Sequence, residues 1–215
     1  MKIDPTLYKG RPADTRIPKE ERCYELLDRL CIEYCRADHE HADTIEQCHE
    51  IEKLLGAEIC KNLLLTNRQM TDIYLLLMPG DKPFKTKILS KQIGTARLSF
   101  ASPEQMLDCL DITPGSVSVL GLMNDKAGKV RLLIDRDLLK DERFGCHPCI
   151  NTSTLSFSTR DLIEKIIPAM GHERCRPRSA AFYRRPSPGY TRTHNSRKRR
   201  MCASLCRAGY RSGSS

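Results

Sequence analysis

The chain has 215 residues and a formal net charge of +9, but this charge is concentrated at one end. Residues 174–215 contain 12 Lys plus Arg and no acid, whereas residues 1–173 contain 24 basic and 27 acidic residues. The body is therefore slightly acidic, which excludes a broadly basic nucleic-acid-binding domain. An RNA contact in the body requires a local patch of lysines, such as Lys82, Lys85, Lys87 and Lys91. A solvated lysine face is the alternative.

Three regions are expected along the chain. Residues 1–19 contain three prolines and predict an extended arm, and residues 20–173 are long enough for one domain with its own core. Residues 174–215 predict a disordered tail. Their abrupt change of composition resembles translation through a shifted frame or a stop codon, and an RNA-binding extension is the alternative. No stretch approaches the roughly 20 apolar residues that cross a bilayer, so we expect a cytoplasmic protein without a membrane partner.

Four segments carry helix signals. Apolar residues recur at helical spacing over residues 20–30. Capping-box residues precede residues 45–55 and 106–110, and a glycine follows the first of these two segments. Thr159 and a Pro-x-x-Gly stop bound a last predicted helix over residues 160–169.

Five apolar segments are predicted strands. Residues 59–65 and 73–78 predict an antiparallel pair that is buried on both faces. Residues 116–123 and 130–134 predict a second hairpin, and residues 152–157 predict a strand after a Gly-Cys-His-Pro turn. Helices interspersed with hairpins indicate an α+β, or mixed α/β, domain.

That turn belongs to the segment FGCHPCINTSTLSF, which concentrates polar groups on rigid backbone. Pro148 fixes its own φ and favours an extended His147, so the imidazole is held at the mouth of a strand. Asn151 follows on the same turn. The segment therefore indicates a site, and an ordinary turn with one hydrogen-bonded histidine is the alternative.

Two other segments carry polar residues among apolar ones. Lys61 and Asn62 interrupt an apolar run, where a charged side chain needs a reason. Gly115 allows the backbone to approach a ligand, and Ser116 and Ser118 add small hydroxyls. An outward-pointing lysine and an ordinary Pro-Gly turn remain the alternatives.

Taken in their order along the chain, these segments resemble those of the YbaK/ProX-type aminoacyl-tRNA deacylases. Within that family the resemblance is to the prolyl-tRNA editing proteins. The resemblance covers about residues 21–173. Three motifs carry it: a "KN" strand (Lys61, Asn62), a glycine loop (Gly115–Gly121) and an "HPxxN" turn (His147, Pro148, Asn151). It implies a single domain with a strongly curved, nearly barrel-like mixed sheet and helices outside.

The resemblance also implies the reaction, which is hydrolysis of the ester between a wrong amino acid and the terminal ribose of tRNA, most specifically in alanyl-tRNA(Pro). It implies catalytic roles for Lys61 and His147, no metal or other cofactor, and activation of water with help from a ribose hydroxyl. The implied substrate-binding residues are Asn62, Gly115, Ser116, Ser118 and Asn151. The implied partners are the acceptor end of mischarged tRNA and prolyl-tRNA synthetase.

Several alternatives stay open. The substrate could be cysteinyl-tRNA(Pro) or another small aminoacyl-tRNA, and Val119 and Leu120 stand where family members frequently carry Pro-Phe, which bears on selectivity. The fold could serve as a non-catalytic module that binds tRNA or a synthetase. Cys146 or Cys149 could act as a nucleophile. A zinc site is a further alternative, with ligands drawn from Cys146, His147, Cys149 and one of His39, His41 and Cys35.

Overall fold

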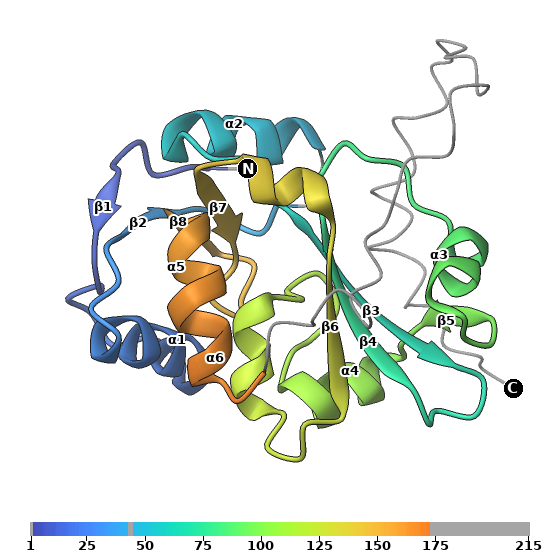
Figure 1. Cartoon of the computed structure of the whole chain (residues 1–215). Coiled ribbons are helices and arrows are strands. Elements are labelled where there is room, and N and C mark those ends of the chain that lie inside the picture. Colours follow the sequence, from blue (N-terminus) through green and yellow to red (C-terminus); the bar gives the residue numbers. More distant parts are fainter. Residues whose placement is uncertain (1, 43–44, 173–215) are drawn as a thin grey trace, which may run out of the picture.

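Two four-stranded sheets, with helices around them, make up the part of the chain that the structure describes (Figure 1). The structure is a computed structural model and describes residues 2–42 and 45–172. It confirms the α+β class. The predicted disordered tail, residues 174–215, lies outside the described residues and stays a prediction.

The first sheet is antiparallel throughout, with the strand order β1-β2-β8-β7. Its strands are β1 (Tyr8–Lys9), β2 (Tyr34–Asp38), β8 (Ser153–Ser158) and β7 (Arg143–Cys146). The predicted strand at residues 152–157 is confirmed as β8. Part of the N-terminal arm pairs with β2 and forms the sheet edge. Strands β2 and β7 are short and mix charged with apolar residues, so their sequences carry no clear strand period.

The second sheet is mixed, with the strand order β5-β3-β4-β6. Its strands are β5 (Leu98–Phe100), β3 (Lys61–Asn67), β4 (Ile73–Met78) and β6 (Val130–Ile134). Strands β3 and β4 form the predicted antiparallel pair, with Lys61 opposite Met78, whereas β6 runs parallel to β4. The start of β3 therefore lies at the same end of the second sheet as the last residues of β4 and β6.

The expected barrel-like sheet is wrong. Neither sheet closes on itself, and within residues 2–42 and 45–172 a single bridge, between Ile59 and Gly145, joins the two sheets. The backbones are very close there, because a Cβ on Gly145 would lie 2.7 Å from the Glu58 carbonyl oxygen. The chain leaves β7 after Cys146 and turns toward β8, which begins at Ser153.

The predicted hairpin of residues 116–123 with 130–134 is also wrong. Its first half contains a 3-10 helix, η1 (Val119–Asn124), and its second half is β6, the parallel neighbour of β4. A short apolar run does not reveal its own period, so the sequence cannot separate these forms. Gly121 permits the helix to pack closely, because an added Cβ would overlap the Ile112 side chain.

Helices occur where capping signals predict them, and also where the sequence lacks such signals. The helices α1 (Pro18–Arg29), α2 (Ile45–Leu55) and α4 (Pro103–Leu110) confirm three predicted segments, and the capping box of Ser102 and Gln105 is present at α4. The cap expected at α2, Thr44, lies outside the described residues. Helix α3 (Thr86–Ile93) and the 3-10 helix η2 (Arg136–Lys140) are additional, and α3 has no side-chain cap.

The predicted last helix is present, but its pitch changes along its length. It consists of α5 (Thr159–Asp161), a π-helical segment η3 (Leu162–Ile166) and α6 (Ile167–Ala169). Pro168 has no N–H to donate, and a wider turn accommodates it. The N-cap is Ser158, not the expected Thr159, because the Ser158 hydroxyl accepts the Asp161 N–H at 3.4 Å.

The main core lies between the two sheets. Alternate residues of β3 and β4, such as Leu64 and Leu75, pack there with Phe157 of β8 and with the apolar faces of α1 and the last helix. The intervening residues, such as Leu65 and Leu76, face the other way and pack under α3. Helix α2 covers the outer face of the first sheet (Figure 1). This arrangement buries β3 and β4 on both faces, as predicted.

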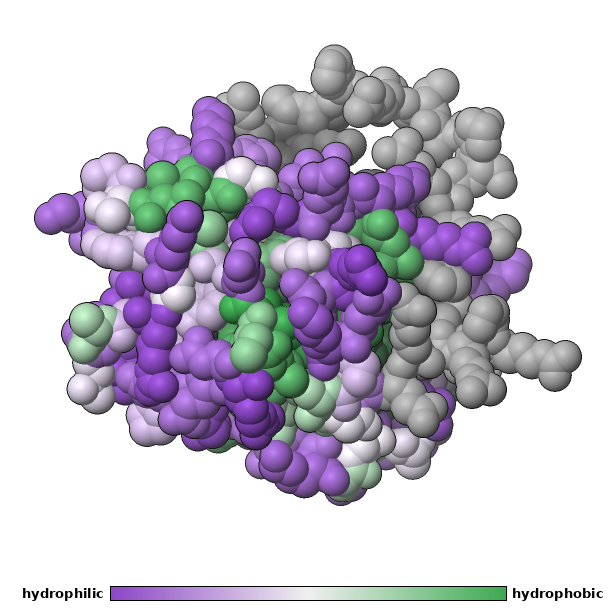
Figure 2. Space-filling model, turned by 60° about the vertical axis from the view of Figure 1, so that its left-hand side comes forward, coloured by the Kyte–Doolittle hydropathy of each residue, from purple (hydrophilic) through white to green (hydrophobic). Residues whose placement is uncertain are grey.

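The surface is mostly polar on the face drawn in Figure 2, where small hydrophobic areas are separated by hydrophilic side chains. Within the described residues, no helix combines the length and apolar character needed to span a membrane.

Candidate active site

Gly145 and Cys146 of the Gly-Cys-His-Pro segment end β7, and His147 is the first residue of the turn that leads to β8. The Ser118 hydroxyl donates to the His147 carbonyl oxygen at 2.5 Å and also accepts the Leu120 N–H at 3.2 Å. Cys149 has φ of +61°, a left-handed conformation that costs a residue with a side chain some strain. The turn is thus held in an unusual backbone shape by the glycine-loop segment.

A chain of hydrogen bonds fixes the tautomer of His147. His39 Nδ1 donates to the Glu40 carbonyl oxygen at 2.8 Å, so His39 Nε2 accepts the Thr154 hydroxyl at 2.9 Å. His147 Nδ1 lies 3.0 Å from the Ser153 carbonyl oxygen and 3.2 Å from the Thr154 oxygen. Both are acceptors here, so Nδ1 carries the proton. The lone pair of a neutral His147 is therefore on Nε2, which hydrogen-bonds to no residue that the structure describes.

The electrostatics keep this imidazole neutral. Burial lowers the pKa of His147 to about 4, and the neighbouring His39 and His41 rings also disfavour the cation. Burial likewise lowers the pKa of His39. The two rings are close, with centroids 6.2 Å apart. Near pH 7 His147 is thus a hydrogen-bond acceptor and a weak base.

Asn151 lies beside the glycine loop. Its Nδ2 donates to the Ala42 carbonyl oxygen at 3.0 Å and lies 3.4 Å from the His41 ring nitrogens. Asn151 is 3% exposed, and its Oδ1 is buried without a hydrogen-bond partner in the described chain. Gly115, with φ of +86°, is so close that an added Cβ would lie 3.7 Å from the His41 ring and 3.8 Å from Asn151 Nδ2.

The structure therefore brings the HPxxN turn and the glycine loop together. Ser118 contributes through its bonds to the turn, and Ser116 is buried with its N–H donating to the Thr113 carbonyl oxygen at 3.1 Å. Their substrate contacts stay predictions. Val119 and Leu120 are fully buried in the main core, so they serve packing first.

Lys61 and Asn62 belong to the second sheet. The Lys61 ammonium donates to the Lys82 carbonyl oxygen at 3.0 Å, and Asn62 Nδ2 donates to the Cys60 carbonyl oxygen at 3.2 Å. The Cys60 N–H donates to the Gly145 carbonyl oxygen at 3.2 Å, two residues before His147. This backbone bond connects the start of β3, and with it Lys61, to the turn.

Lys82 does not belong to an exposed lysine patch, and this expectation is wrong. Its side chain is buried and lies 2.6 Å from Asp135 and 2.8 Å from Asp137. By contrast, Lys85, Lys87 and Lys91 are exposed at and along α3.

The cysteines of the turn are buried. Cys149 Sγ lies 3.6 Å from Cys23 Sγ, and burial raises the pKa of the Cys146 thiol. A buried thiol with a raised pKa is a poor nucleophile. Within residues 2–42 and 45–172, no group of three or more His, Cys, Asp or Glu residues has the arrangement of a metal site.

Three site residues escaped the sequence reasoning as members of the histidine network: His39, His41 and Thr154. The His-x-His spacing after a short strand is a signal that could have found the first two, because alternate residues of extended chain share a face. Thr154 is fully buried. A buried hydroxyl needs a hydrogen-bond partner, but its partner is visible only in three dimensions.

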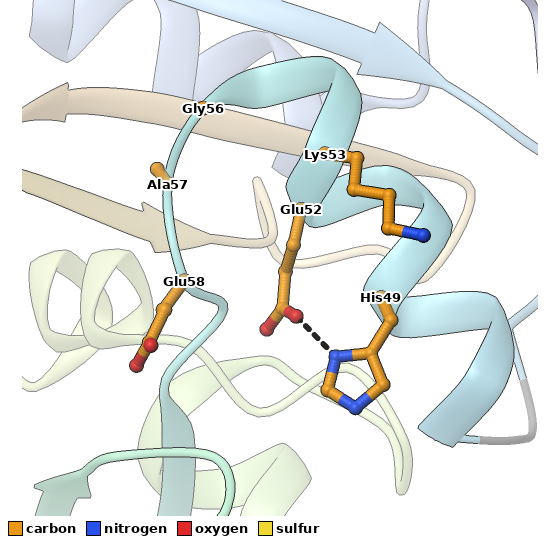
Figure 3. A pocket seen from close by; sticks show the side chains of 6 residues that line it. All are labelled: His49, Glu52, Lys53, Gly56, Ala57 and Glu58. Atoms are coloured by element: carbon orange, nitrogen blue, oxygen red, sulfur yellow. Dashed lines mark hydrogen bonds and ion pairs between the residues drawn. The ribbon is translucent and has the colours of Figure 1, made fainter.

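A surface hollow of about 320 Å³ lies elsewhere, at the end of α2. Figure 3 shows its lining residues, where His49 Nδ1 and a Glu52 oxygen are 2.6 Å apart. None of the predicted site residues lines it: the lining is His49, Glu52, Lys53, Gly56, Ala57 and Glu58. This hollow is therefore separate from the candidate active site.

The domain that contains these residues is similar to known proteins. The aminoacyl-tRNA editing domain family matches residues 39–165, which contain every candidate site residue. The chain belongs to this family. The resemblance to YbaK/ProX-type deacylases is confirmed, and with it the enzyme class, aminoacyl-tRNA deacylase.

Several relatives are similar over most of their length. The prolyl-tRNA editing protein ProX of Acetoanaerobium sticklandii is 34% identical over 146 residues, which are 68% of this chain and 88% of ProX. Prolyl-tRNA synthetase associated domain-containing protein 1 of Mus musculus is 30% identical over 152 residues, with the same 68% and 88% coverage. The crystal structure of a proposed trans-editing enzyme for prolyl tRNA synthetase has the same fold, with a TM-score of 0.56 at 16% identity over 74% of this chain and 96% of that one.

Proposed function

We propose that this protein is a freestanding trans-editing hydrolase that deacylates mischarged tRNA(Pro), with alanyl-tRNA(Pro) as the preferred substrate. Water attacks the ester carbonyl carbon, the bond to the ribose oxygen breaks, and the products are free alanine and tRNA with a terminal hydroxyl. The family supports editing of aminoacyl-tRNA, and the name of the relative ProX, a prolyl-tRNA editing protein, supports tRNA(Pro) as the tRNA that is edited. The preference for alanine follows from the sequence resemblance.

The observation that carries this proposal is a pair of hydrogen-bond acceptors on one turn. His147 Nε2 has the lone pair of a neutral imidazole, and Asn151 Oδ1 is buried without a partner in the described chain. A buried acceptor without a partner is costly, so a ligand that donates to it gains affinity. The α-ammonium group of an aminoacyl ester is such a donor. We therefore assign His147 and Asn151 to holding the amino group.

His147 then orients the substrate and does not abstract the proton from water. A base with a pKa of about 4 has little driving force for proton removal at neutral pH. No serine hydrolase triad is needed if a ribose hydroxyl of the substrate helps to activate the water, as the family resemblance implies. Gly115 permits close approach of the loop backbone to the bound ester.

Lys61 is assigned to stabilisation of negative charge. An ammonium group that is fixed by a hydrogen bond can face the developing oxyanion or the phosphate next to the terminal ribose. The exposed lysines along α3 are assigned to the tRNA backbone. Binding to prolyl-tRNA synthetase is an additional proposal, supported only by the names of relatives.

A deacylation assay tests the proposal. tRNA(Pro) charged with alanine, serine, cysteine or proline is incubated with the full-length protein, and release of each amino acid is followed. We expect alanyl-tRNA(Pro) to be hydrolysed fastest and prolyl-tRNA(Pro) to be spared. Lys61→Ala should lower kcat by about 10² to 10³ and His147→Ala by about 10 to 10².

Two outcomes contradict the proposal in different ways. Faster hydrolysis of cysteinyl-tRNA(Pro) would keep the enzyme class and change the substrate. Tight binding of all four tRNAs without turnover would identify a non-catalytic binding module. Circular dichroism of both variants separates loss of the site from loss of the fold.

A further inference from the structure

A buried ion pair lies at the end of the second sheet where β3 begins and where β4 and β6 end. Lys82 follows β4 and Asp135 follows β6, and their charged groups are 2.6 Å apart. Lys82 is 5% exposed and Asp135 is 0% exposed. Asp137 adds a second carboxylate at 2.8 Å from the same ammonium group. Separation of such a buried pair would leave an uncompensated charge, so the three side chains are held together.

The backbone around Lys82 is held as well. The Lys82 N–H donates to the Pro79 carbonyl oxygen at 3.2 Å, and the Asp135 N–H donates to the Leu77 carbonyl oxygen at 2.9 Å. Gly80 lies against the residue two positions before β3, because an added Cβ would be 2.8 Å from the Ile59 carbonyl oxygen. The segment 79–82 therefore has a defined place relative to the start of β3.

The same residue contacts Lys61. The Lys82 side chain binds Asp135 and Asp137, while the Lys82 carbonyl oxygen accepts a hydrogen bond from the Lys61 ammonium at 3.0 Å. Because the carbonyl is anchored through its own side chain, the direction of the Lys61 ammonium depends on the ion pair. The geometry joins a buried structural network to a predicted catalytic residue.

We propose that Lys82 is a positioning residue for Lys61 and that Asp135 and Asp137 are its anchors. This inference rests on the proposed function, in which Lys61 contacts the acceptor end of the substrate. Without the anchors, the segment 79–82 moves, and the Lys61 ammonium samples several directions. The loss then appears in kcat, because a misdirected charge stabilises the transition state less well.

The first test measures Lys61 without any tRNA. The double variant Lys82→Met/Asp135→Asn removes both charges of the pair together. In the wild-type protein the Asp137 N–H donates to an Asp135 carboxylate oxygen at 2.9 Å, and the amide oxygen of the Asp135→Asn change can accept the same hydrogen bond. Reductive methylation by formaldehyde and a borohydride, followed by mass spectrometry, reports the reaction rate of the Lys61 amine in the full-length folded protein. A hydrogen bond to a carbonyl favours the protonated amine, so we expect several-fold faster methylation of Lys61 in the variant.

The matched control breaks a neighbouring pair. Lys140 lies 2.7 Å from the other oxygen of Asp137, and its side chain is 74% exposed. Lys140→Met should leave the methylation rate of Lys61 unchanged, because exposed pairs contribute little. If the double variant does not fold, Asp137→Asn removes one anchor from a more exposed position and should change the rate in the same direction. An unchanged Lys61 rate in a folded variant overturns the inference.

The second test uses turnover of the preferred aminoacyl-tRNA. The double variant should lower kcat by about 10-fold in the wild-type background and by less than about 2-fold in the Lys61→Ala background, because both changes act through one group. Equal losses in both backgrounds would show a general structural role and overturn the inference. If the wild-type protein deacylates no tRNA, the proposed function fails, whereas the methylation rates still decide whether Lys82 positions Lys61.

Discussion

At the scale of single residues, the hydroxyl of Thr154 joins two histidines. It donates to His39 Nε2 at 2.9 Å and lies 3.2 Å from His147 Nδ1. Thr154→Val removes this hydroxyl at nearly constant volume and leaves the buried His39 nitrogen without its donor, which should cost about 1 to 3 kcal/mol of unfolding free energy. His147 keeps its bond to the Ser153 carbonyl, so the loss of turnover should be smaller than in His147→Ala.

The control for this change is Thr159→Val, because the buried Thr159 hydroxyl has no hydrogen-bond partner in the described chain. Chemical denaturation of the two variants makes the comparison. Thr159→Val should be neutral or stabilising. Equal destabilisation by both substitutions would show that the Thr154 hydroxyl adds nothing beyond its volume.

The low pKa of His147 sets the pH dependence. With a folded-state pKa of about 4, the His147 ring is neutral throughout the usual assay range. Its protonation should therefore not lower the deacylation rate between about pH 5.5 and 8. An acid limb should appear only as the pH falls toward 4. A wild-type titration near pH 6 to 7 that His147→Ala abolishes would instead identify His147 as a general acid or base.

The same shift affects stability. An unfolded histidine titrates near pH 6.5, so the unfolded chain binds more protons than the folded chain between about pH 6.5 and 4. The free energy of unfolding should therefore fall as the pH drops through this window, by up to about 3 kcal/mol for the full shift. His147→Ala should make the curve flatter. Urea titrations at several pH values give the measurement.

At the scale of elements, α3 presents cations without acids. Lys87 and Lys91 are one turn apart, so they share a face of the helix, and both are exposed. Lys87→Glu/Lys91→Glu should raise KM for aminoacyl-tRNA by about 10-fold at low salt, reduce the salt dependence of binding and leave kcat nearly unchanged.

A second double variant has the same change of net charge. Lys126→Glu/Lys129→Glu lies in the loop before β6, and both lysines are exposed. Filter binding over a range of salt concentrations compares the two variants. The same increase of KM in both would mean that net charge, and not the α3 surface, governs tRNA binding.

At the scale of the whole molecule, the motifs of the editing domain and the net positive charge lie in different parts of the chain. All candidate site residues fall within residues 39–165, and residues 174–215 hold 12 cations and no acid. Deletion of 174–215 should weaken salt-sensitive, sequence-independent binding to tRNA and keep turnover at saturating substrate nearly constant. An unfolded or inactive truncated protein would show that the segment belongs to the working structure.

The sequence by itself determined the features that depend on neighbouring residues. The capping box of Ser102 and Gln105 starts α4, and Gly56, with φ of +61°, follows the end of α2. The HPxxN turn and the glycine loop were also predictable, because proline and glycine restrict or release the backbone locally. These signals were enough to indicate the fold class and most of the candidate site.

Only the tertiary structure decided the features that depend on distant pairing. Val130–Ile134 pairs in parallel with β4 and not with the segment before it, because strand partners are chosen by the packing of the whole sheet. Lys82 is buried in an ion pair because Asp135, 53 positions along the chain, lies beside it at the same end of the second sheet. The His39–Thr154–His147 hydrogen bonds likewise join distant parts of the chain: His39 follows β2, Thr154 lies in β8 and His147 belongs to the turn before β8. The hydrogen-bond partners of such buried polar groups cannot be assigned from the residues on either side.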